Sequence, residues 1–237
     1  MTSPDALAPT GALRASINLG NAVLTNGSSE QPAGISIDSA RELGRRLDVP
    51  VELVLFDAAR KSVDAVRDGV ADVCFLAVDP VRAEELAFTA PYVLIEGAYA
   101  VRDASPLRSA DEVDRRGTRI GVKLGSAYDL HLTRTLEAAE LVRGSDGLDV
   151  FAEQDLEVAA GVAQPIRAHV AANPGLRVLD GAFMQIPQAV AVSRRHDEAT
   201  IAWVRSVVDE LISTGWVAEA LARHGHDPAL AAVDGAS

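Results

Sequence analysis

The sequence predicts an α/β protein made of two lobes. Short apolar, β-rich runs alternate along the chain with segments of helical periodicity, a pattern typical of mainly parallel sheets flanked by helices. Two strand-like runs, near 92–101 and 186–193, are long enough to cross between two lobes. The length of 237 residues also fits two lobes of about 100 residues each better than one core. We therefore expect lobe 1 at 1–98 and 192–237 and lobe 2 at 99–191.

The sequence predicts four strands and two helices in the first half of the chain. The expected strands are 13–19, 51–56, 73–78 and 92–101, and the expected helices are 36–47 and 62–68. Ser36 is the candidate N-cap of the first helix, because its hydroxyl can accept a backbone N–H. Gly69 follows the second helix at the position that favours a left-handed backbone. The run 73–78 is continuously apolar, which predicts a strand buried on both faces.

The second half continues the alternation. The expected strands are 118–123, 148–151, 176–179 and 186–192, and the expected helices are 126–136, 153–160, 164–172, 197–214 and 216–224. Ser109 and Glu112 match a capping box and predict one more short helix. Gly215 and Gly225 end the two closing helices, which we expect to return to lobe 1.

Charge and composition exclude several classes of function. The net charge of −12 argues against nucleic-acid and anionic-membrane partners, which require a basic face. No apolar run is long enough to span a bilayer, so we expect no direct membrane insertion. The single cysteine, Cys74, excludes an intramolecular disulfide and lies in an apolar run, as a core residue would. The common phosphate-loop, dinucleotide, hydrolase-elbow and zinc-protease motifs are missing, so we expect no cofactor and no metal.

The first residues, 1–10, have no basic segment followed by an apolar one. The sequence as given therefore predicts a cytoplasmic protein, or a periplasmic or extracellular one if a leader was removed. We expect a monomer.

Arg82 is the first candidate binding residue. It follows the buried run 73–78 and so lies at the carboxyl end of the sheet, where open α/β sheets bind ligands. A guanidinium matches a carboxylate with two parallel hydrogen bonds. The alternative is a solvated arginine paired with Glu84 or Glu85.

Ser126 and Glu96 are the other candidates. Ser126 starts a helix directly after a strand, where free backbone N–H groups favour an anion, although the serine can also simply cap that helix. Glu96 stands inside a long apolar run, so it either faces solvent at a sheet edge or points into a cleft.

Several segments together resemble the bacterial extracellular solute-binding proteins of family 3, which are amino-acid-binding proteins of ABC importers. The segment 69–73 (GVADV) is followed by 79–82 (DPVR) and then, six residues after the arginine, by 88–92 (FTAPY). This order is similar to the family's central signature, and 120–126 (IGVKLGS) resembles its second-lobe motif. The resemblance covers roughly residues 13–224.

The resemblance implies a type II periplasmic-binding-protein fold with a two-strand hinge and a ligand cleft between the lobes. Arg82 matches the arginine that binds the ligand carboxylate. The backbone around Ala77 and Asp79, and Ser126 with its helix N-terminus in the opposite lobe, would bind the same carboxylate. Tyr128, beside Ser126, is a further candidate ligand-binding residue.

The chain also departs from the family pattern. Asp79 replaces the usual threonine or serine, and it can instead cap the helix that begins at Pro80. Polar Asn18 and Asn21 replace an aromatic-rich segment after the first strand, and are ligand candidates. In the family, an acidic residue of the second lobe binds the ammonium group of the amino acid. The corresponding position in this chain is near 161–162, where there is no acidic residue. Glu96 or Glu157 could replace it, the neutral Gln164 is a further cleft candidate, and the ligand could also lack an amine.

We therefore predict a bacterial solute-binding protein that captures a small carboxylate-bearing molecule, as for ABC-type uptake, with a possible ABC permease as partner and no catalytic residue. One alternative is an enzyme similar to cyclohexadienyl dehydratases, with Glu96 as general acid. A ligand-sensing domain in the cytoplasm is the third reading.

Overall fold

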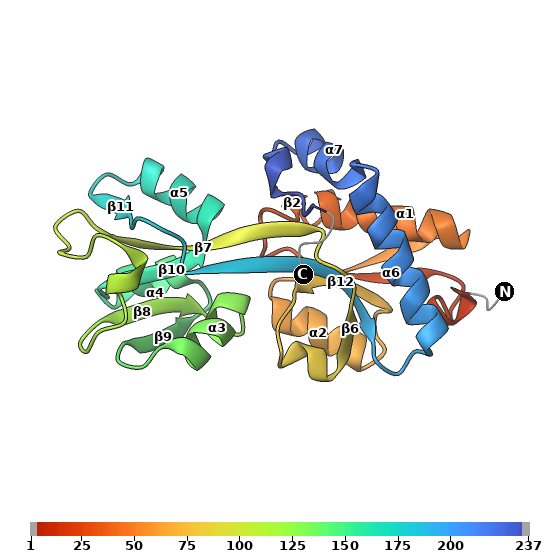
Figure 1. Ribbon diagram of the computed structural model, residues 1–237, viewed down its shortest axis with the longest axis horizontal. Helices are drawn as coiled ribbons and strands as arrows, with labels where there is room; N and C mark the ends of the chain where they lie inside the picture. Colours follow the sequence, from red (N-terminus) through yellow and green to blue (C-terminus); the bar gives the residue numbers. More distant parts are fainter. Residues whose placement is uncertain (1–3, 234–237) are drawn as a thin grey trace. The chain divides into compact units, whose positions relative to one another are not determined.

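The computed structural model describes residues 4–233 (Figure 1). The chain forms two compact units, unit 1 at Met1–Leu94 with Pro187–Ser237 and unit 2 at Ile95–Ile186. It passes from unit 1 to unit 2 within strand β7 (Val93–Arg102) and returns within strand β12 (Met184–Ser193). The expected lobe boundaries at 98/99 and 191/192 lie within the same two strands and stay a prediction.

Unit 1 contains a mixed sheet with the strand order β4-β1-β5-β12. Its strands are β1 (Leu13–Asn18), β4 (Val51–Phe56), β5 (Val73–Ala77), β6 (Leu86–Phe88) and the second part of β12. A separate two-stranded sheet is formed by β2 (Asn26–Gly27) and β3 (Pro32–Ala33). Strand β1 runs parallel to β4 and β5, whereas β12 runs antiparallel to β5 and β6. Its helices are α1 (Ile35–Leu47), α2 (Ala59–Arg67), α6 (Glu198–Ser213) and α7 (Trp216–Arg223).

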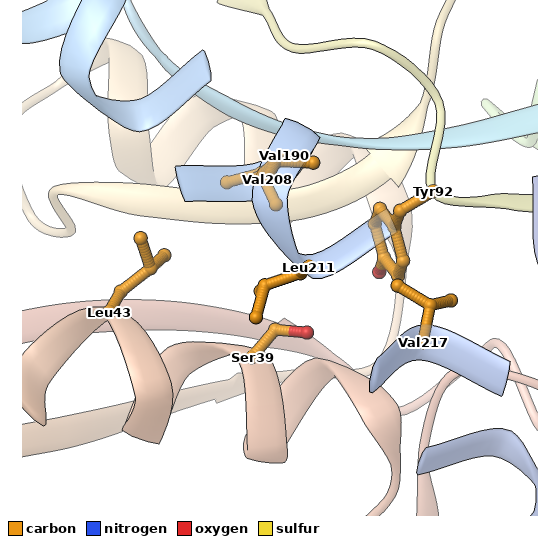
Figure 2. A pocket seen from close by; sticks show the side chains of 7 residues that line it. All are labelled: Ser39, Leu43, Tyr92, Val190, Val208, Leu211 and Val217. Atoms are coloured by element: carbon orange, nitrogen blue, oxygen red, sulfur yellow. The ribbon is translucent and has the colours of Figure 1, made fainter. Parts of the chain in front are cut away.

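The helices of unit 1 bury both faces of this sheet. Helix α2 packs against Cys74 and Leu76 of β5. Helices α1, α6 and α7 lie on the other face, where Val190 of β12 points toward them (Figures 1 and 2). Every residue of β5 is buried, which confirms the prediction from its continuous apolar run.

Unit 2 contains the strand order β7-β10-β8-β9, with β11 on the other side of β7. Its further elements are β8 (Arg119–Lys123), α3 (Ala127–Thr135), β9 (Glu140–Gly144), α4 (Gly147–Glu153), β10 (Val158–Val162), α5 (Ala163–Ala172) and β11 (Leu176–Val178). Strand β8 runs parallel to β9 and β10, and β7 runs antiparallel to β10 and β11. Both units thus combine parallel and antiparallel strands with helices, as the predicted α/β class requires.

Two predictions in unit 2 are wrong. The segment 148–151 is not a strand but part of α4, which Asp146 caps by accepting the Leu148 N–H at 2.8 Å. The segment 153–160 is not a helix, because its second part begins β10, which pairs with β7 and β8. Strand β9 was not predicted. The alanine-rich β10 has helical propensity, but its place between two strands overrides that preference.

The start of α1 also differs from the prediction. The helix begins at Ile35, so Ser36 is inside it, and the Ser36 hydroxyl has no hydrogen-bond partner among the described residues. The N-cap is Gly34, whose φ of 117° suits glycine. A Cβ at this position would lie 2.5 Å from the Leu24 carbonyl oxygen, so close backbone packing selects the glycine. Ser109 stands at the N-cap of the short helix Ala110–Glu112, as predicted, but its side chain makes no capping hydrogen bond.

An arginine–carboxylate clamp joins neighbouring parallel strands in each unit. Arg14 of β1 donates its backbone N–H (2.8 Å) and Nε (3.1 Å) to Oδ2 of Asp72, which precedes β5. Arg119 of β8 donates the same two groups, at 2.8 and 2.9 Å, to Oε2 of Glu157, which precedes β10. The same bonding pattern therefore holds the amino ends of the parallel strands in both units.

Glu42 on α1 gives unit 1 a stability that depends on pH. It accepts hydrogen bonds from Arg45 and Arg46, which lower the pKa of its carboxyl from 4.5 to about 2. A carboxylate with a lowered pKa stabilises the fold above its unfolded value, and this contribution is lost as the pH falls through the folded value. We expect Glu42→Gln to flatten the decline of the unfolding free energy between pH 4.5 and 2, measured by urea denaturation.

The control for this experiment is Glu30→Gln, since Glu30 is exposed and pairs with no described residue. Equal pH slopes for the wild type and Glu42→Gln would contradict the prediction.

Candidate functional site

Arg82 lies just after β5, in the turn Arg82–Glu84, and is almost completely buried, with 5% of its surface exposed. Its Nη1 donates to the carbonyl oxygen of Ala77, at the carboxyl end of the strand, at 3.0 Å. Burial lowers the pKa of the guanidinium, and the charge of Asp79 opposes this effect. A desolvated cation at the end of a buried strand favours an anionic ligand, because an anion compensates for the lost hydration. The alternative of a solvated surface arginine is therefore wrong.

Asp79 shapes the turn that carries Arg82. Its Oδ1 accepts the N–H of Val81 at 2.9 Å, and its backbone carbonyl accepts the N–H of Ala83 at 2.9 Å. Asp79 therefore caps the turn that begins at Pro80, as its sequence position predicts. The Ala77 carbonyl is already engaged by Arg82. A role for the backbone of Ala77 and Asp79 toward a ligand stays a prediction.

Ser126 is the N-cap of α3 in unit 2, with its Oγ accepting the N–H of Asp129 at 3.1 Å. The carboxylate of Asp129 accepts the N–H of Gly125 at 2.8 Å and pairs with Arg143 at 2.9 Å. One backbone donor of this helix start is thus already bound to a carboxylate of the chain. The Ser126 hydroxyl also interacts with the Tyr128 hydroxyl, and a role of Ser126 toward a ligand stays a prediction.

The sequence prediction missed Asp129 and Arg143. An aspartate in the first turn of a helix was the available signal for Asp129, because the free N–H groups attract it. Arg143 lies on a strand that was not predicted. Tyr128 is buried, and burial raises the pKa of its hydroxyl.

Asn18 and Asn21 organise the loop that follows β1. The side-chain oxygen of Asn18 accepts the N–H of Gly20 at 3.0 Å, and that of Asn21 accepts the N–H of Val23 at 3.2 Å. Both are local turns of the kind that asparagine favours. Their amide nitrogens take no part in these two bonds, so a role toward a ligand stays a prediction.

Glu157 does not lie where a ligand amine was expected. It precedes β10, at the amino end of the strand, and both of its oxygens accept hydrogen bonds from Arg119. The proposal that Glu157 replaces the missing acid is therefore not supported by its position. Gln164, in contrast, is the second residue of α5, beyond the carboxyl end of β10. Its Oε1 is buried and has no hydrogen-bond partner among the described residues, so it can accept a donor from a ligand.

Glu96 lies on β7 within unit 2 and is about half exposed. Its carboxylate lies 3.6 Å from the guanidinium of Arg167 on α5. A half-exposed carboxylate beside a cation is not the desolvated acid that the dehydratase alternative requires.

The small cavity of unit 1 and the buried cysteine do not make a site for a solute or a metal. The cavity of Figure 2, in unit 1, has a volume of about 10 Å³, enough for one water molecule, and its lining is mostly apolar. No group of three or more potential metal ligands occurs in the described part of the chain. Cys74 is buried, which raises the pKa of its thiol to about 12, as expected for a core residue. Among residues 4–233, no helix has the length and apolar character to cross a membrane.

Comparison with known proteins agrees with these features. Residues 22–227 match the family described as bacterial extracellular solute-binding proteins, family 3. No curated protein matches the sequence.

Amino-acid-binding proteins are among the solved structures that are similar to this chain, and the likeness confirms the expected periplasmic-binding-protein fold. Holo ArgBP from T. maritima is 21% identical, with a TM-score of 0.73 and coverage of 90% of this chain and 96% of that one. AbpA from Streptococcus pneumoniae, bound to L-arginine, is 18% identical, with a TM-score of 0.76 and coverage of 93% and 97%. The ancestral amino-acid-binding protein AncCDT-1, a precursor of cyclohexadienyl dehydratase, is 20% identical, with a TM-score of 0.75 and coverage of 94% and 99%.

Proposed function

Because the chain belongs to the bacterial extracellular solute-binding proteins of family 3, we propose that it captures a small carboxylate-bearing solute, an amino acid or a related organic acid, through Arg82. The observation that carries this proposal is the burial of the Arg82 guanidinium at the carboxyl end of β5. Burying a guanidinium costs hydration, and a bound carboxylate would offset part of that cost with charge-assisted hydrogen bonds, in addition to the charge of Asp79.

Ser126 and the start of α3 are the second group that we propose for the same carboxylate. A hydroxyl and a helix N-terminus both stabilise negative charge. Gln164 is proposed to accept an N–H or O–H of the solute, since no acid stands at 161–162. We further propose that the protein delivers its solute to an ABC permease.

The alternative function is that of a dehydratase. It is favoured by one similar structure, which is described as a precursor of cyclohexadienyl dehydratase. Glu96 would act as the general acid in that case. Turnover of prephenate or arogenate that is abolished in Glu96→Gln would establish the enzyme and exclude a purely binding role. A ligand-sensing domain in the cytoplasm would instead bind its solute and a partner protein other than a permease.

The carboxylate requirement is tested with matched ligands. We expect an amino or organic acid that raises the Tm in a thermal-shift screen to lose this effect when its carboxylate is replaced by the neutral carboxamide. The stabilisation follows RT ln(1 + [L]/Kd), so a ligand at 100 times its Kd contributes about 2.7 kcal/mol. Equal stabilisation by the acid and its carboxamide would contradict the proposal.

Ser126→Asp separates capping from ligand binding in the same screen. Aspartate is as good an N-cap as serine, so the ligand-free protein should keep its Tm. The added negative charge should repel the solute carboxylate and weaken binding by at least about tenfold. Ser126→Ala is the complementary variant, which should lower the ligand-free Tm through loss of the cap. Wild-type affinity in Ser126→Asp would remove Ser126 from the site.

A further inference from the structure

All residues that line a second, polar cavity belong to unit 2. Arg82, which belongs to unit 1, does not line it. The cavity has a volume of about 380 Å³ and is lined by residues of β7, α5, the end of β11 and the segment that follows β11. Its charged lining residues are Glu96, Arg167 and Asp180, and its apolar lining residues include Ala98, Val178 and Leu179. It is therefore large enough for a molecule the size of an amino acid.

The wall of the cavity is held in place by β7. Leu179 and Phe183 donate their N–H groups to the carbonyl oxygens of Tyr99 and Gly97, at 2.9 and 3.1 Å. The Phe183 ring stacks on Tyr99 with 4.3 Å between ring centroids. A Cβ at residue 97 would lie 2.5 Å from the Phe183 ring, so the glycine makes room for it. The segment 179–183, which includes Asp180, is thus fixed beside Glu96.

The charged groups of the cavity retain capacity to bind a ligand. Glu96 and Arg167 form a half-exposed ion pair at 3.6 Å, a distance longer than that of a hydrogen bond. The carboxylate of Asp180 forms no ion pair or hydrogen bond with any described residue. One guanidinium and two carboxylates can therefore bind a partner without breaking an existing hydrogen bond.

We propose that this cavity binds a small dipolar ion, with an ammonium group at Glu96 and Asp180 and a carboxylate at Arg167. The mixture of charges selects this class. Arg167 would repel a ligand that is only cationic, and the two acidic residues would repel one that is only anionic. The apolar lining residues Ala98, Val178 and Leu179 fit a short aliphatic group. This site does not depend on the function proposed for Arg82.

The test is an NMR titration of the full chain with three probes that share a carbon skeleton: L-alanine, propionate and ethylamine. L-Alanine should shift the backbone amides of 96–98 and 178–182 in a saturable way with a millimolar Kd, because the binding groups are partly exposed. Propionate and ethylamine should bind at least about tenfold more weakly.

Variants assign the effect to the cavity. Glu96→Gln and Arg167→Gln should each weaken the response about tenfold and still fold, since both side chains are about half exposed. Arg116→Gln, at an exposed arginine outside the cavity, is the matched control and should keep it. Arg82→Lys should also keep the response, which separates this site from the one proposed at Arg82. Absence of saturation up to roughly 50 mM, equal responses to all three probes, or an unchanged response in Glu96→Gln would overturn the proposal.

Discussion

Replacing Arg82 with alanine is expected to weaken binding of the carboxylate-bearing solute by about 2–4 kcal/mol, or roughly 30- to 1000-fold. The guanidinium is nearly fully buried against the Ala77 carbonyl. Its loss would leave the solute carboxylate desolvated and without its cation. Isothermal titration calorimetry measures this change directly.

Two further variants make the Arg82 experiment decisive. Arg82→Lys keeps the positive charge beside Asp79, so it should fold, yet it lacks the planar fork and should still lose affinity. Arg41→Ala removes an exposed arginine of unit 1 and should bind as the wild type does. Unchanged affinity in Arg82→Ala would remove Arg82 from the binding site and, with it, the main support for the proposed function.

Replacing Asp72 with alanine is expected to lower the unfolding free energy by roughly 2–4 kcal/mol. The Asp72 side chain is 4% exposed and accepts hydrogen bonds from both the backbone and the side chain of Arg14. Its removal would leave a backbone N–H and a partly buried guanidinium without their acceptor. Urea denaturation of the ligand-free protein measures the effect.

Glu157 provides a matched comparison in unit 2. It forms the same pattern of bonds with Arg119, but both side chains are 40% exposed. Water can replace the lost partner there, so Glu157→Ala should destabilise the protein less than Asp72→Ala. A larger loss in Glu157→Ala than in Asp72→Ala would show that burial does not govern the strength of these clamps.

The amino-acid sequence was sufficient for the α/β class, for most elements and for the residues that carry the family motifs. Periodicity and turn chemistry act over a few residues, so they located β5, the left-handed Gly69 that follows α2 and the N-cap at Ser126. The spacing from 69–73 through Arg82 to 88–92 likewise sufficed to indicate the solute-binding family, which the match over residues 22–227 confirms.

Contacts between distant parts of the chain determined the elements and pairs of residues that the sequence did not predict. The segment 158–162 became a strand because β7 and β8 flank it, and Gly34 replaced Ser36 as N-cap because the backbone at Leu24 approaches it. Arg14 and Asp72 stand 58 positions apart, so nothing local pairs them. Packing free energy in such places exceeds the small intrinsic preferences of single residues, and it arises only once the chain has folded.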